Sequence, residues 1–202
     1  RAGWVEHQLA FLPMTDTGNA QRLELLHGNN IAYLPEKGKG SAWMVWDGKR
    51  WEASFESSLY GLVSDTAAKA KRAFESLAKL EAAPEVTIKA GIGDKAKDIS
   101  AAVRAQKAEL KAIREAYREK EKAHRAAFFV QSGNQFRIDA CLKRSRGLFE
   151  ASINDFDRDP YALNTQNGII DLKKGMLHPH DRARMCSRIT RAAYRPELIG
   201  KE

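Results

Sequence analysis

The sequence predicts an α+β fold, rich in helix, in which two β-hairpins flank a helical middle. Apolar residues recur at helical spacing over two long segments, 63–83 and 97–130. Two other segments, 42–52 and 167–178, alternate apolar and polar residues around a glycine-containing turn. The 202 residues include 43% apolar and 30% charged side chains, which suits one globular domain and excludes a disordered tail or a fibre.

The first quarter of the chain is predicted to contain one helix and the first hairpin. Residues 15–27 open with N-cap residues, continue with good helix formers and stop at Gly28, so they form a short helix. Residues 31–35 and 42–52 alternate strongly enough to form strands.

The turn of this hairpin lies at Asp47-Gly48, between two tryptophans. A loop of two residues places Met44, Trp46 and Trp51 on one face of the sheet, whereas a loop of three moves Trp51 to the other face. The tryptophans form either the core side of the hairpin, which is the favoured interpretation, or a platform for single-stranded bases.

The middle of the chain is predicted to be helical. An apolar stripe over 63–83 indicates an amphipathic helix, and a longer stripe over 97–130 indicates a second. A third helix covers about 134–145, with an extension through Phe149 left open. A short strand is expected around 86–88, between the first two helices.

The last quarter of the chain returns to a strand pattern. Residues 167–172 and 176–178 form the second hairpin across Lys174-Gly175. A further strand is predicted over 189–194, before the chain reaches a proline.

The charge of the chain is basic and uneven, with a formal net charge of +8 and a pI near 9.5. Residues 1–60 hold 6 basic and 7 acidic side chains, residues 61–130 hold 15 and 10, and residues 131–202 hold 13 and 9. Such an excess favours polyanionic partners, nucleic acid first, although a merely solvated helix face is the alternative. The candidate DNA-contacting cations are Lys107, Lys111, Arg114, Arg118, Lys122, Arg125, Lys143, Arg144, Arg146, Lys49 and Arg50.

Patterns typical of catalytic sites are missing from the sequence. The glycine-rich segment 38–41 lacks the spacing of a phosphate-binding loop, and neither a nucleophile elbow nor a His-Glu-x-x-His pattern occurs. We therefore predict no catalytic residue and no bound metal. Cys141 and Cys186 are too few for a disulfide framework and are expected to be buried or idle thiols in a reducing cytoplasm. No apolar run approaches the roughly 18 residues that cross a membrane.

One acidic cluster has two interpretations. Asp155, Asp157 and Asp159 alternate as metal-binding carboxylates do, so a metal-dependent, primase-like nucleotidyl-transfer site is an alternative function. A calcium loop that opens at Asp155 would need glycine and glutamate where the chain has Pro160 and Gln166. Turn formation before Pro160 is the favoured interpretation.

Two groups of residues, near the two ends of the chain, form a recognisable pattern. They are Asp16, Gly18, Asn19, Arg22, Trp46, Asp47, Gly48 and Trp51, followed by Asp159, Pro160, Asn164, Asn167, Gly168, Asp171, Leu172, Gly175, Pro179 and His180. Together they resemble the N-terminal domain of phage and plasmid primase-helicases, which is shared with the poxvirus helicase-primase. The resemblance covers about 14–60 and 130–196, and residues 84–128 are interpreted as an inserted helical segment.

The resemblance implies a non-catalytic domain of a DNA-replication protein, encoded by a phage or plasmid and located in the bacterial cytoplasm. In this family the domain precedes a superfamily-three helicase, a hexameric ATPase, and a primase often lies further upstream. The expected partners are therefore DNA, contacted through its backbone, and the helicase ring, with no membrane. ATP and Mg are expected only in the helicase, so no cofactor is expected here.

The implied organisation is a single collar domain over residues 1–202. It would comprise an N-terminal helix and hairpin (14–60), a helical region (61–150) and a C-terminal hairpin region (151–196). A third function class stays open, namely a protein-interaction module that recruits a replication factor through the middle helices.

Overall fold

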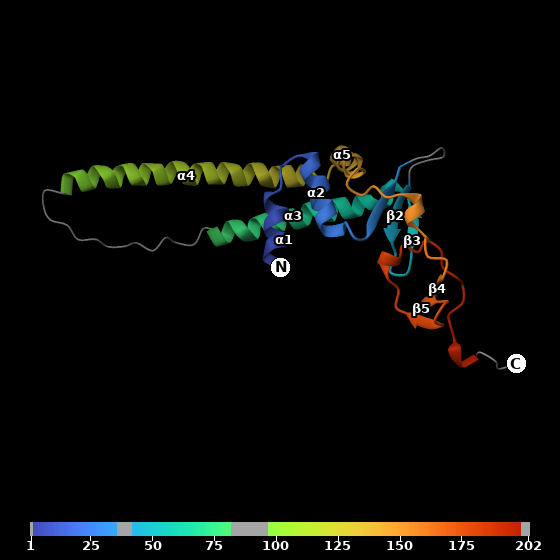
Figure 1. Cartoon of the computed structure of the whole chain (residues 1–202). Helices are drawn as coiled ribbons and strands as arrows, with labels where there is room; N and C mark the ends of the chain where they lie inside the picture. The colour runs from blue at the N-terminus through green and yellow to red at the C-terminus, as the bar shows by residue number, and fades with distance from the viewer. Residues whose placement is uncertain (1, 36–41, 82–96, 199–202) are drawn as a thin grey trace.

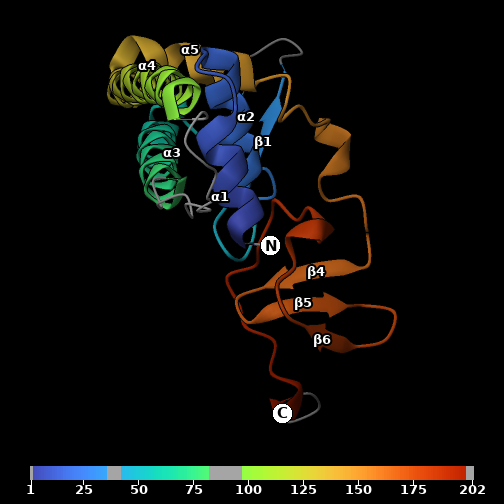
Figure 2. The same ribbon diagram turned by 90° about the vertical axis from the view of Figure 1, so that its left-hand side faces the viewer.

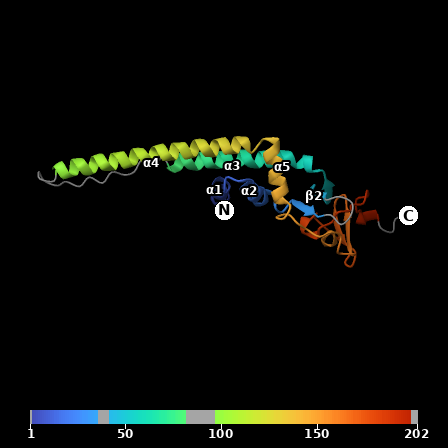
Figure 3. The ribbon, with the colours of Figure 1, turned by 90° about the horizontal axis from the view of Figure 1, so that it is seen from above.

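The computed structural model describes residues 2–35, 42–81 and 97–198. Its helices are α1 (Ala2–Phe11), α2 (Asp16–His27), α3 (Tyr60–Glu81), α4 (Lys97–Gln131) and α5 (Gln135–Ser145). Its strands are β1 (Ile31–Leu34), β2 (Ala42–Trp46), β3 (Trp51–Ser54), β4 (Ala162–Thr165), β5 (Gly168–Asp171) and β6 (Met176–His178). These elements confirm the α+β class. Helices α3 and α4 lie side by side and extend as a long arm to one side of the molecule. The two sheets lie at the opposite side (Figures 1 and 3).

Helices α1 and α2 both pack against α3. Helix α2 confirms the prediction over 15–27, and its N-cap Thr15 accepts a hydrogen bond from Gly18 N at 3.1 Å. Helix α1 is not predicted from the sequence, because its apolar residues surround the helix instead of forming a stripe. Its Leu9 is nevertheless buried in a cluster with Phe74 of α3, so tertiary packing holds α1 in place.

The first sheet is an antiparallel meander in the order β1-β2-β3. Trp46 pairs with Trp51, so the four residues 47–50 form the connection. Directly paired residues point to the same face of a sheet, so Met44, Trp46 and Trp51 share one face, as predicted for the two-residue loop. Asp47 N also donates to the Arg50 carbonyl at 3.0 Å, which closes the turn around Gly48 and Lys49, in agreement with the two-residue loop.

The tryptophans of this sheet confirm the core interpretation. Trp43 is buried on one face, with its ring centroid 6.0 Å from that of Phe149. Trp51 is buried on the other face, 6.0 Å from Phe156, and Trp46 is half-buried beside it. The sheet is therefore packed on both faces, and no described tryptophan of the sheet is free to act as a platform for bases.

The middle helices follow the predicted periodicity. Helix α3 begins three residues before the predicted 63–83, since a 3-10 turn (Glu56–Leu59) leads directly into it. Helix α4 matches the prediction over 97–130, and α5 ends four residues before Phe149, which is buried in the core. The strand expected at 86–88 lies outside the described residues. In the described part of the chain, no helix combines the length and hydrophobicity needed to cross a membrane.

The second sheet confirms the predicted hairpin over 167–178 and adds β4, in the order β4-β5-β6. The strand predicted over 189–194 is wrong, because this segment is irregular and touches β4 through isolated bonds such as Thr190 N to the Asn164 carbonyl at 2.9 Å. Side-chain amides donate to carbonyls within and next to this segment, and no regular backbone ladder forms. The donors are Asn164 for Arg188, Gln166 for Thr190 and Asn167 for Tyr194.

The C-terminal region is attached to the first hairpin by hydrogen bonds. Trp51 donates its backbone N–H to the Cys186 carbonyl at 2.8 Å and its indole N–H to the Arg182 carbonyl at 2.9 Å. Asn164 Nδ2 donates to the Lys49 carbonyl, also at 2.9 Å. These bonds connect the C-terminal region to the first sheet, and the second sheet lies below β1 in Figure 2.

Candidate nucleic-acid interface

Arg22, one of the pattern residues near the start of the chain, is a fully buried cation. Its Nε donates to the Leu9 carbonyl at 2.7 Å, its Nη1 to the Pro13 carbonyl at 2.9 Å, and its Nη2 to the Leu12 carbonyl. These carbonyls lie at the C-terminal end of α1, where helix geometry leaves them without intrahelical donors and favours positive charge. Burial, together with the charge of Arg125, lowers the pKa of Arg22 to about 10, so it stays charged at neutral pH.

Asn19 and Asp16 extend this junction from α2 to α4 and α5. Asn19 accepts from Arg22 Nη1 at 3.3 Å and donates to Ser132 Oγ at 2.9 Å, just past the end of α4. Asp16 forms an ion pair with Arg137 of α5 at 3.1 Å. Asp16, Asn19 and Arg22 therefore join α1, α2, the end of α4 and α5.

Two aspartates of the pattern shape turns. Asp47 accepts the backbone N–H groups of Lys49 and Arg50, each at 2.7 Å. Burial raises the pKa of Asp47, but these hydrogen bonds and the Arg50 charge outweigh it, so the pKa lies below its ordinary value. Asp171 holds the β5–β6 turn in the same way through Lys173 N at 2.9 Å. Asp47 and Asp171 thus stabilise the hairpin turns of the two sheets.

The acidic cluster at residues 155–159 does not converge on one point. Within the described residues, no three His, Cys, Asp or Glu side chains gather as a metal-binding group. Each carboxylate instead accepts from a different part of the chain. The donors are Ser152 N for Asp155, Ser187 N for Asp157, and Tyr161 N with Arg184 Nη1 for Asp159.

Both cysteines are buried and unpaired. Burial raises the pKa of the Cys141 thiol to about 11 and also raises that of Cys186. A thiol in such surroundings is a weak nucleophile at neutral pH, which agrees with the prediction of buried or idle thiols.

Three of the candidate cations are committed to partners inside the fold. Arg125 donates to the Ala10 carbonyl at 3.2 Å and pairs with Glu121 at 2.9 Å. Arg146 pairs with Glu56 at 3.0 Å, and Arg50 pairs with a carboxylate of β3 at 2.6 Å. These side chains form their hydrogen bonds with α1, α4, the 3-10 turn before α3 and the first sheet, so a ligand would have to compete with these partners.

Two further candidates on α4 are paired along the helix. Lys122 lies 2.7 Å from Glu119, and Lys111 lies 4.0 Å from Glu115. Arg118 is exposed. Lys107 and Arg114 belong to the helix, but their side chains lie outside the described residues. In the first hairpin turn, Lys49 Nζ donates to Gln166 Oε1 at 3.3 Å.

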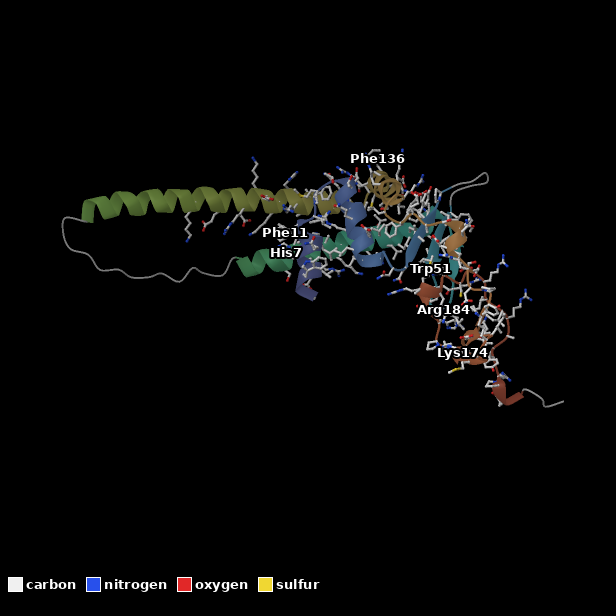
Figure 4. The ribbon with its side chains drawn as sticks, in the orientation of Figure 1. His7, Phe11, Trp51, Phe136, Lys174 and Arg184 are labelled. Atoms are coloured by element: carbon white, nitrogen blue, oxygen red, sulfur yellow. The ribbon has the colours of Figure 1, made fainter. Side chains whose placement is uncertain are left out.

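The cations of the last turn of α5 are the clearest exception. Lys143 and Arg144 are both exposed, and no acidic group among the described residues lies within 4 Å of either. Phe136, the second residue of the same helix, projects away from the molecule with 80% of its surface exposed (Figure 4). Sequence reasoning missed Phe136, although its spacing of seven residues from Lys143 places both on one helix face.

Comparison with known families identifies the fold. The family model described as "D5 N terminal like" matches residues 20–201. The chain belongs to this D5 N-terminal-like family. The family is the N-terminal domain of D5-like primase-helicases, which confirms the resemblance and associates the chain with DNA replication. The matched range of the D5 N-terminal-like domain includes both sheets and the α3–α4 arm, and α1 precedes it. No curated protein matches the chain.

Proposed function

We propose that this chain is a non-catalytic domain of a phage- or plasmid-type replication protein, which connects to a superfamily-three helicase ring and binds DNA through its backbone. Family membership supports the connection to a helicase. ATP and Mg would then act in the helicase domain, and the compartment would be the bacterial cytoplasm. Several pattern residues support a connecting role, since Arg22, Asn164 and Asp171 hold helices and turns together.

The single observation that carries the DNA contact is the pair of exposed, unpaired cations on α5. A cation already held by a carboxylate gains little from a phosphate, because it must give up its first partner. Lys143 and Arg144 have no such partner among the described residues, so a phosphate would neutralise them at no such cost. Contacts of this kind fix a nucleic acid by its backbone without reading its bases.

Salt titration of DNA binding tests this proposal. We expect a labelled 20-nucleotide single strand, followed by fluorescence anisotropy, to bind with an affinity that falls steeply as salt rises. In the variant Lys143→Ala/Arg144→Ala, the slope of log K against log salt should shrink by about 1.4, since each lost phosphate contact accounts for about 0.7 on single strands.

A matched control removes the same charge from another surface. Lys69 and Arg72 are exposed on α3, beside α1, and the variant Lys69→Ala/Arg72→Ala also lowers the net charge by two. Its salt slope should stay close to that of the unchanged chain. Equal losses in the two double variants would mean that net charge alone drives binding, and the α5 contact would be rejected.

A further inference from the structure

Helix α5 has two unlike faces. Its inner face is buried through Ile138, Cys141, Leu142 and Ser145, which fixes the rotation of the helix against α2. Its outer face carries Phe136, which lies in solvent at the upper edge of the molecule (Figure 4). Because the buried face fixes the rotation of α5, the side chains of the outer face have a defined direction toward solvent.

The outer face carries an aromatic ring, one small side chain and two cations. Phe136, Ala140 and Lys143 follow one another at spacings of four and three residues, so they lie along one line of the helix surface. The small side chain of Ala140 separates the ring from the cation. At 1.5 Å per residue, Lys143 lies about 10 Å and Arg144 about 12 Å along the axis from Phe136.

We propose that this outer face of α5 binds single-stranded DNA, with one base stacked on Phe136 and the phosphates of the neighbouring nucleotides on Lys143 and Arg144. This inference rests on the proposed function and adds the type of strand. The separation of about 10–12 Å along the helix axis lies within the reach of a few nucleotides of one strand. One ring and two cations can therefore contact the same short stretch of strand.

The exposed ring favours a single strand over the alternatives. A base inside a duplex already stacks on its neighbours, so only an unpaired base can stack on Phe136 without first leaving a helix. A protein partner would need a wider apolar surface, whereas the rest of this face is small or charged. The nearest acidic side chain on α5, Asp139, accepts from Gln135 Nε2 at 2.8 Å, so its carboxylate is engaged along the helix.

Single substitutions at position 136, assayed on two DNA probes, test the inference. We expect Phe136→Ala to weaken binding of a 20-nucleotide oligothymidylate by about tenfold or more, since base stacking on an aromatic side chain is worth about that ratio. Binding of a 20-base-pair duplex should change less than about twofold, because the duplex offers no free base. Phe136→Trp should restore the affinity for the single strand.

The control is an aromatic side chain exposed far from α5. Trp4 of α1 is 61% exposed, and Trp4→Ala should leave both probes unaffected. An equal loss on both probes, or no loss on oligothymidylate, would overturn the single-strand assignment. If Phe136→Ala has no effect while Lys143→Ala/Arg144→Ala still flattens the salt slope, the proposed function stands and this inference alone fails.

Discussion

Replacing Arg22 with methionine should lower the free energy of unfolding by about 3–5 kcal/mol. Methionine keeps most of the volume but none of the donors, so the carbonyls of Leu9, Leu12 and Pro13 lose their partner inside the fold. Asn19 also loses the donor that orients its amide toward α4. Urea denaturation followed by tryptophan fluorescence measures the change, because the buried Trp43 and Trp51 report on the core.

A neighbouring arginine provides the control for this prediction. Arg137 is partly exposed and forms one ion pair with Asp16, so Arg137→Met should cost about 1 kcal/mol or less. Similar losses for both variants would show that Arg22 acts as an ordinary surface ion-pair residue. The four-helix junction would then have to be held by apolar packing alone.

Adding a methyl group at Gly18 should destabilise the chain by about 3 kcal/mol, near the upper end for overpacking. A Cβ at this position would lie 1.9 Å from the Pro13 carbonyl oxygen and 3.2 Å from Arg22 Nη1. That oxygen belongs to the backbone and already accepts from Arg22, so it cannot move aside without breaking the junction. Thermal unfolding followed by circular dichroism should show a clearly lower Tm for Gly18→Ala.

Gly61 is the matched control, because it also lies in a helix but has open space around it. No atom lies within 4 Å of a Cβ built on Gly61 in the second position of α3. Gly61→Ala should therefore stabilise the chain slightly, by about 0.5–1 kcal/mol, through the lower entropy of the unfolded state. A Tm for Gly18→Ala at or above that of the unchanged chain would contradict the close approach of α2 to the α1–α2 connection.

The fold could be predicted where the signal is local. The stripe of α4, the caps of α2 and the glycine turn of the β5–β6 hairpin all act over a few residues, and each prediction is confirmed. Helix α1 was missed because it depends on Arg22 and on α3, which are remote in sequence. The strand over 189–194 was wrong because two side-chain amides bind its carbonyls and a third binds the carbonyl just before it, and alternation of residues does not reveal such partners.

The candidate interface was less predictable than the fold, because it depends on which cations are already paired. Arg125 and Arg146 look like helix-surface cations in the sequence, yet they pair with Glu121 and Glu56 and contact buried rings. Pairs at positions i and i+4, such as Arg125 with Glu121, could be read from spacing. The pair of Arg146 with Glu56 spans 90 residues, so the spacing of residues in the sequence does not predict it.

Photocrosslinking maps the DNA contact most directly. The chain would be irradiated with a single-stranded oligonucleotide that carries photoreactive thymine analogues, and the crosslinked peptides would be identified by mass spectrometry. We expect the crosslinks to fall within residues 135–147, on and just after α5. Crosslinks confined to the β2–β3 hairpin or to the second sheet, with none on α5, would contradict the assignment of the DNA contact to this helix.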